Sequence, residues 1–345
     1  MTTTKNSILV SPRTLAVITL FGVVMGCRVA RTPRDEAQGQ GPVGIERRTR
    51  RPNTQAILVL MPRSPAAENV LSGLTQELER DYDLLTRYVD RSTTPARIDQ
   101  IIRETDPRAI VLMNNPTVRL YRRYQALRRT DNFPPAVVVL TSFIERTSVG
   151  LQNFTGIAYE VPLVTSLVNL RALLRQPILK VGVLYRPEFA DYIADQRALA
   201  RVEQFDLQGV EVSGTGPGEI RRALRQLQGA DVVWVLNDNV LLRQRSITQG
   251  WLPYLERNWL PVVVNVGSLV TSDFDFGTFA VLPDHRALGL QTANVLLDLA
   301  AQDWRLRAQR IELPISVQTV LDVGIAQKRL QLNETELARV DRVIR

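Results

Sequence analysis

Short apolar runs separated by amphipathic segments recur along most of the chain. The first half contains apolar runs at residues 56–60, 109–113 and 136–140, and an alternating stretch at 84–89. Between them, apolar residues recur every three or four positions, which is the period of an amphipathic helix. Continuous apolar runs of this length are typical of strands buried on both faces of a parallel sheet. This half therefore predicts a doubly wound α/β lobe.

The same rhythm recurs in the second half of the chain. Strands are predicted there at residues 179–185, 209–213, 231–236 and 261–265. A long helix is predicted over 241–259, and a helix starting after Pro283 is predicted to return to the first lobe. Because ligands of open parallel sheets lie at the carboxyl ends of the strands, the polar residues that follow these runs are the candidate binding residues.

The N-terminal residues have the organisation of a secretory signal. Lys5 and Arg13 precede an apolar stretch at residues 15–24, which is too short to span a bilayer. The stretch ends in Val24-Met25-Gly26-Cys27, which resembles the bacterial lipobox and implies cleavage before Cys27 and acylation of that cysteine. The alternative is an ordinary signal or anchor with an incidental cysteine. We therefore expect residues 1–26 to be a lipoprotein signal peptide.

Residues 27–54 are predicted to be a flexible tether. They contain few apolar residues and are rich in arginine, glycine, glutamine and proline. Such a segment would hold the folded part away from a membrane surface, on the extracytoplasmic side of the cell envelope. We also expect a lipid on Cys27 to anchor the protein to that membrane.

Composition narrows the possible chemistry. The chain of 345 residues has a formal charge of +8, and only three of its 43 basic residues are lysines. The arginines are scattered among acids along helical patterns, so nucleic-acid binding is disfavoured. The single histidine, His285, begins a helix and is expected to be solvated or to cap it. No metal site, cofactor motif or nucleophile–base pair is found, so we expect a protein that is not an enzyme and needs no cofactor or metal.

Four segments, in their order and spacing, carry a family resemblance. They are Asn153-Phe154-Thr155-Gly156-Ile157, Val181-Gly182-Val183-Leu184-Tyr185-Arg186-Pro187, Leu236-Asn237-Asp238-Asn239, and Leu321-Asp322-Val323-Gly324-Ile325-Ala326 with Leu330. Together they resemble the substrate-binding lipoproteins of bacterial ABC importers, and more narrowly the tryptophan- and tyrosine-type binding proteins. The resemblance implies a type I periplasmic-binding-protein fold with two parallel-sheet lobes joined by a hinge. It places residues 55–156 and about 284–312 in lobe 1, 157–283 in lobe 2, and 313–345 in a C-terminal segment near the hinge.

The chain departs from the family pattern where ligand contacts would lie. Arg186-Pro187 replaces Asn-Pro, Asn237-Asp238-Asn239 replaces Thr-Asp-Asn, and Asn114-Asn115-Pro116-Thr117 replaces Thr-Pro-x-Ala. The segment before Thr141-Ser142 also lacks the usual Asp-Pro. The family fold is therefore carried over, whereas the family ligand is not.

Twelve residues at the predicted strand ends are candidates for ligand binding. Those of the first lobe are Ser64, Asn114, Asn115, Thr117, Thr141 and Ser142; those of the second are Tyr159, Tyr185, Asn237, Asp238, Asn239 and Ser268. Helix N-termini with Ser, Thr and Asn side chains would take a carboxylate, Asp238 an ammonium, and Tyr185 an apolar or aromatic group. The alternative for several of them is a role in turns or helix caps.

Two functions fit these patterns. The first is a membrane-tethered solute-binding protein that captures a small amino-acid-like ligand for an ABC permease. The second is an envelope lipoprotein of the same fold that regulates or informs an envelope protein without transport.

Overall fold

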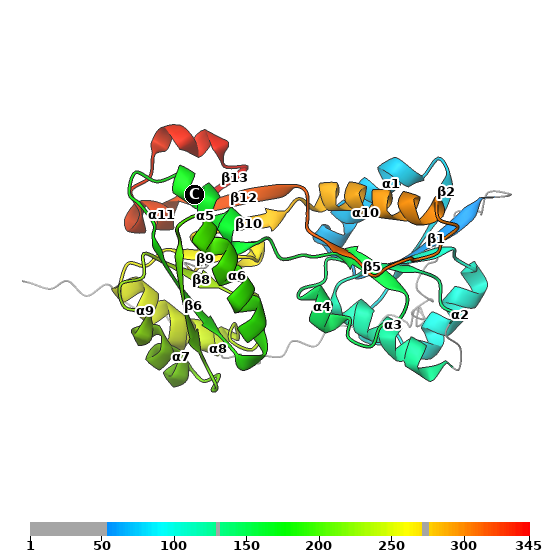
Figure 1. Cartoon of the computed structure of the whole chain (residues 1–345), viewed down its shortest axis with the longest axis horizontal. Coiled ribbons are helices and arrows are strands. Elements are labelled where there is room, and N and C mark those ends of the chain that lie inside the picture. Colours follow the sequence, from blue (N-terminus) through cyan, green and yellow to red (C-terminus); the bar gives the residue numbers. More distant parts are fainter. Residues whose placement is uncertain (1–53, 129–131, 271–275) are drawn as a thin grey trace, which may run out of the picture. The chain divides into compact units, whose positions relative to one another are not determined.

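The computed structural model describes residues 54–128, 132–270 and 276–345. The predicted signal peptide, Cys27 and all of the predicted tether except Thr54 lie outside the described residues. Within them the chain forms two sheets, each covered by helices (Figure 1). In the described part of the chain, no helix is both long enough and apolar enough to cross a membrane.

The first sheet has six strands in the order β11-β5-β4-β3-β1-β2, and all its neighbouring pairs are parallel. Its strands are β1 (Gln55–Met61), β2 (Tyr82–Tyr88), β3 (Ala109–Met113), β4 (Ala136–Val139), β5 (Phe154–Ile157) and β11 (Ile311–Glu312). The residues of β3 and β4 are buried throughout, as the continuous apolar runs predict.

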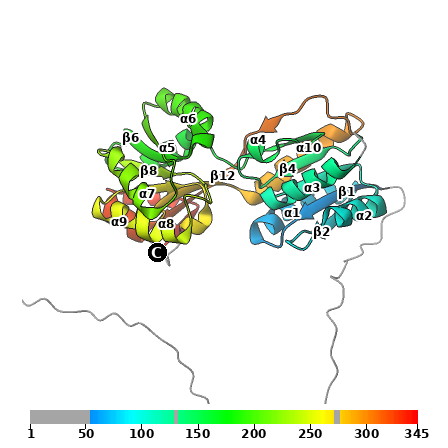
Figure 2. The same cartoon turned by 90° about the horizontal axis from the view of Figure 1, so that it is seen from below.

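Helices cover both faces of this sheet, as Figure 2 shows. Successive strand residues point to opposite faces, so Ile57 and Val59 pack under α1 (Pro65–Leu78) and α10 (His285–Ala300). Leu58 and Leu60 pack under α2 (Pro95–Thr105), α3 (Asn115–Leu127) and α4 (Ile144–Thr147). The sheet therefore separates two apolar cores.

The second sheet has seven strands in the order β13-β12-β10-β9-β8-β6-β7. They are β6 (Lys180–Tyr185), β7 (Asp206–Glu211), β8 (Val232–Val235), β9 (Val262–Val264), β10 (Phe279–Pro283), β12 (Val317–Asp322) and β13 (Arg342–Ile344). The pair β10–β12 is antiparallel and the others are parallel, so the sheet is mixed, whereas a wholly parallel sheet was predicted. The segment 313–345, predicted to pack near the hinge, contributes two strands to this sheet.

Helices also cover both faces of the second sheet. Helices α5 (Leu163–Ala172), α6 (Ala190–Val202) and α11 (Val323–Arg329) pack on one face. On the other face lie α7 (Pro217–Leu224), α8 (Gln244–Ser246) and α9 (Leu252–Arg257). Short 3₁₀ turns occur at η1 (Pro187–Phe189), η2 (Arg225–Leu227), η4 (Gly267–Leu269) and η5 (Glu334–Arg339).

The helix predicted over 241–259 is interrupted by a π-helical turn, η3 (Ile247–Trp251). In an α-helix the N–H of residue 253 would donate to the carbonyl oxygen of Gln249. Pro253 has no N–H, so this hydrogen bond cannot form. The guanidinium of Arg221 on α7 donates to that carbonyl instead. The missing N–H of Pro253 therefore accounts for the interruption, and Arg221 satisfies the carbonyl oxygen that it leaves free.

The chain passes three times between the two sheets. The passages follow β5, which leads to α5 of the second sheet, β10, which leads to α10 of the first, and β11, which leads to β12. Three passages between two α/β sheets are the connectivity that the predicted two-lobed fold requires. We call the six-stranded sheet with its helices the first lobe and the seven-stranded sheet with its helices the second lobe.

Candidate functional site

The loop after β4 is held against the start of α3 by the side chain of Asn115. Its Nδ2 donates to the carbonyl oxygen of Ser142 at 2.9 Å, and its Oδ1 accepts from the Ser142 N–H at 2.9 Å. The buried Thr141 donates from Oγ1 to the carbonyl of Val139 at 3.3 Å. Three predicted site residues are thus brought together, and the Ser142 side chain remains available for other contacts.

Ser142 connects the carboxyl ends of strands in the two sheets. Asn237, which follows β8, donates from Nδ2 to the Ser142 Oγ at 2.8 Å. Both residues are partly exposed. Two candidates predicted in different lobes therefore meet directly, and both lie at the strand ends where ligands of α/β sheets bind.

Asp238 is paired with an arginine of its own lobe. Its carboxylate accepts from Arg186 Nε at 2.6 Å and from Nη2 at 2.9 Å, and Asp238 is 3% exposed. Sequence reasoning assigned this carboxylate to a ligand ammonium, but in the structure Arg186 already neutralises it. The hydrogen bond from Arg186 also raises the pKa of that guanidinium.

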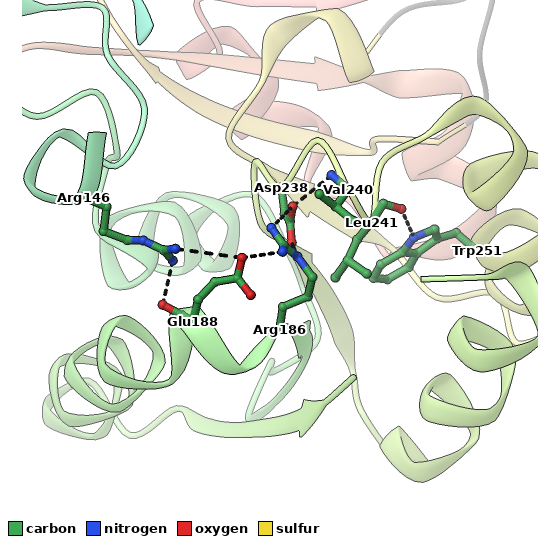
Figure 3. Close-up of polar contacts among 7 residues, drawn as sticks. All are labelled: Arg146, Arg186, Glu188, Asp238, Val240, Leu241 and Trp251. Atoms are coloured by element: carbon green, nitrogen blue, oxygen red, sulfur yellow. Dashed lines mark hydrogen bonds and ion pairs between the residues drawn. The ribbon is translucent and has the colours of Figure 1, made fainter. Parts of the chain in front are cut away.

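The Asp238–Arg186 pair continues into a chain of charged groups (Figure 3). Arg186 also pairs with Glu188. Arg146 from α4 of the first lobe lies 3.9 Å from the Glu188 carboxylate and donates to the Glu188 carbonyl oxygen at 2.6 Å. Asp238 additionally accepts from the N–H of Val240 at 2.9 Å. The chain of ion pairs therefore runs from the loop after β8 to the first lobe.

Phe143 inserts an aromatic ring between the two lobes. Its ring centroid lies 4.7 Å from that of Phe189 and 5.4 Å from that of Tyr192, which packs in turn on Trp234 at 6.1 Å. The backbone of Phe143 is left-handed, with φ of 49°, a conformation that bulky residues seldom adopt. The predicted residue set omitted all four aromatics. They lie in a loop, a 3₁₀ turn, a helix and a strand, and an apolar side chain in such a segment gives no sign in the sequence that it borders a site.

Glu160 is a second residue that sequence reasoning missed. Its two carboxylate oxygens each accept from the Phe143 N–H at 3.0 Å, and no ion pair joins it to a cation among the described residues. Burial raises the pKa of this carboxyl from an ordinary value near 4.5 to about 7. Burial, and then the nearby Glu160 charge, also raise the pKa of Tyr192. The sequence around Glu160 gave no indication that this carboxyl would be buried.

The raised pKa makes Glu160 a source of pH-dependent stability. A carboxyl that binds its proton more tightly when folded stabilises the fold below about pH 4.5, and this contribution is lost as the pH rises through about 7. Replacing Glu160 with glutamine keeps an acceptor for Phe143 but removes the titration. Between about pH 5 and pH 8 the native protein is expected to lose about 2 kcal/mol more stability than Glu160→Gln. Urea unfolding at the two pH values measures this, and parallel losses would contradict it.

His285 contacts a predicted site residue. Its Nε2 lies 3.2 Å from the Tyr159 hydroxyl, and the two rings stack at 6.0 Å with an interplanar angle of 12°. Burial lowers the pKa of His285 and raises that of Tyr159 to about 12. The expectation that His285 caps the helix was wrong, since the N-cap of α10 is Asp284; the His285 side chain is partly buried and partly exposed.

The other candidate residues cap helices, pack against the core or are exposed to solvent. Ser64 and Asn114 are the N-caps of α1 and α3, and accept from the N–H groups of Ala67 and Thr117. Tyr185 is partly buried and packs against the core of the second lobe. Asn239 and Ser268 are exposed. Ser64 and Asn114 therefore act as helix caps, which was the alternative to ligand binding for these residues.

An arginine-lined cavity of about 580 Å³ lies at the carboxyl edge of the first sheet. Pro62 after β1 and Asn114 after β3 contribute to its wall, and the lining includes the predicted residue Thr117. Thr117 is 1% exposed, and the described residues offer its hydroxyl no hydrogen-bond partner. The described residues contain no group of three or more His, Cys, Asp or Glu side chains placed to hold a metal ion.

Three solved structures share this fold with the chain. A substrate binding protein with adhesive properties from Clostridium difficile, in a ligand-free open structure, matches with a TM-score of 0.62 and 14% identity, over 84% of this chain and 99% of that one. An ABC domain in complex with L-Trp from Streptococcus pneumonia matches with a TM-score of 0.55 and 15% identity, over 84% and 100%. A conserved domain protein from Vibrio cholerae matches with a TM-score of 0.53 and 18% identity, over 84% and 99%.

These similarities establish the fold, and they agree with the two-lobed architecture expected from the sequence. No protein-family model matches the sequence, and no curated protein matches it.

Proposed function

We propose that this protein is an extracytoplasmic solute-binding protein that captures a small amino-acid-like ligand between its two lobes. In this proposal a lipid on Cys27 tethers it to a membrane, and it delivers the ligand to an ABC permease. The proposed role is binding without catalysis. One of the structures that share the fold holds L-Trp, which supports an amino-acid-like ligand.

The observation that carries the proposal is the contact between Ser142 and Asn237. These polar side chains come from the carboxyl ends of strands in different sheets, are partly exposed, and hydrogen-bond to each other at 2.8 Å. A ligand that touches both lobes stabilises their closed arrangement by its differential affinity for it. Ser142 and Asn237 are placed to exchange their mutual hydrogen bond for hydrogen bonds to such a ligand.

Ligand-dependent stability tests the proposal. A solute present at 100 times its dissociation constant is expected to raise the free energy of unfolding by about 2.7 kcal/mol, because it binds only the folded state. Thermal unfolding of the folded region against a panel of amino acids measures this. Asn237→Ala is expected to reduce the shift, whereas Asn294→Ala, at an exposed position of α10, is expected to preserve it.

The regulator hypothesis predicts a different result. If no small solute shifts the unfolding transition and the lipid-anchored protein instead binds a defined envelope protein, the solute-binding proposal is wrong. A shift caused by one solute that Asn294→Ala retains and Asn237→Ala loses favours solute capture over regulation.

A further inference from the structure

We propose that the captured ligand carries at least two negative charges and that its acidic groups bind in the arginine-lined cavity of the first lobe. This inference rests on the proposed function and adds the chemical class of the ligand. Three observations support it: the position of the cavity, the arginines that line it, and the lack of carboxylate partners for those arginines among the described residues.

The cavity lies at the topological switch point of the six-stranded sheet. In the order β11-β5-β4-β3-β1-β2, the chain runs outward from β1 to β2 on one side and from β3 to β4 on the other. The loops after β1 and β3 therefore separate, and crevices at such a point are the usual ligand sites of open α/β sheets. Pro62 and Asn114, from those two loops, both line the cavity.

Four arginines and one carboxylate line this cavity. Arg119, Arg122 and Arg123 are spaced three and four residues apart on α3, so they project from one side of the helix, and Arg91 faces them from the loop after β2. The carboxylate, Asp90, accepts hydrogen bonds from Ser92 and Thr93 within its own turn. The cavity wall therefore carries an excess of positive charge.

These guanidinium groups have no carboxylate partner among the described residues. Arg122 donates to the carbonyl oxygen of Val149 at 2.8 Å, and no described ion pair includes any of the four. A concave site with an excess of charge of one sign focuses the potential and raises the local concentration of the opposite ion. Guanidinium groups bind carboxylates and phosphates through paired N–H donors.

The charge excess distinguishes among amino-acid-like ligands. A neutral amino acid offers one carboxylate, whereas a ligand with an acidic side group offers a second oxyanion to the remaining arginines. A second carboxylate and a phosphate ester share this chemistry.

Matched pairs of ligands test the inference. Calorimetric titration compares L-glutamate with L-glutamine, L-aspartate with L-asparagine, and O-phospho-L-serine with L-serine, with L-tryptophan and L-leucine added as neutral solutes. The acidic member of at least one pair is expected to bind at least tenfold more tightly than its neutral partner. The glutamate and phosphoserine pairs separate the carboxylate source of the charge from the phosphate source.

Arginine variants locate the charge recognition. Arg119→Gln, at an exposed position, is expected to weaken binding of the acidic ligand tenfold or more and to reduce its dependence on salt. Arg225→Gln is the matched control, since Arg225 lines a groove with Arg221 and Arg257 on the second lobe. It is expected to leave the affinity unchanged.

Each remaining outcome decides between the two proposals. If a neutral solute binds and no acidic partner binds more tightly, the charge inference is overturned and the proposed function stands. An acidic ligand whose affinity is unchanged in Arg119→Gln and Arg123→Gln overturns the placement in this cavity. If no solute of either class binds, the proposed function is overturned together with this inference.

Discussion

Replacing Gly289 with valine is expected to lower the free energy of unfolding by about 3 kcal/mol, the upper part of the range for overpacked cores. Helices α1 and α10 cross at Gly73 and Gly289. A Cβ on Gly289 would overlap the backbone carbonyl oxygen of Val70, and one on Gly73 would overlap that of Arg286. Backbone atoms cannot turn aside as a flexible side chain can, so the two helices must separate.

The measurement is urea unfolding of Gly289→Val beside Gly218→Ala. Gly218 lies in the first turn of α7, and a Cβ there meets no atom within 4 Å. Alanine is the better helix former, so Gly218→Ala is expected to be neutral or stabilising by up to about 1 kcal/mol. Equal stabilities of Gly289→Val and the native protein would contradict the close packing of α1 on α10.

Removing the Asp238 carboxylate is expected to cost about 3 kcal/mol of stability. The Asp238 side chain is 2% exposed and that of Arg186 is 20% exposed, so the pair is largely withdrawn from water. Removing one partner of such a pair is costlier than replacing both. Asp238→Ala takes two charge-assisted hydrogen bonds from Arg186, which keeps only Glu188 as a carboxylate partner among the described residues. Asp238→Ala also removes the acceptor for the N–H of Val240 and thereby loosens the loop after β8.

A double-mutant cycle separates the pair from its surroundings. Arg186→Met alone leaves a buried carboxylate, whereas the double variant removes both charges and is expected to recover part of the loss. Asp298→Ala, at an exposed position of α10, is the control for removing a carboxylate and is expected to change stability by less than about 0.5 kcal/mol. If the effects of Asp238→Ala and Arg186→Met were additive, the two side chains would not be coupled.

The strands were largely predictable from the sequence because burial on both faces leaves a distinctive pattern. Runs such as 109–113 and 136–140 coincide with the buried strands β3 and β4. The π-helical turn η3 was not predicted, since its amphipathic period resembles that of an ordinary helix despite Pro253. The antiparallel pairing of β12 also has no local signal, because strand direction depends on a distant partner.

The candidate site was predictable where polar residues follow a strand. Ser142 and Asn237 were identified in this way, and the structure brings them together. Asp238 was identified as well, but its partner Arg186 lies 52 residues away, so the ion pair could not be foreseen. The environment of Glu160 depends on burial at a crossing segment, which sequence spacing does not encode.

Calorimetric titration of the folded region with the amino-acid panel measures whether residues of both lobes capture a solute. We expect saturable binding of one solute molecule per chain, with the affinity lowered at least tenfold by Ser142→Ala from the first lobe and by Asn237→Ala from the second. Absence of saturable binding by every solute in the panel, or binding that neither substitution weakens, would contradict it.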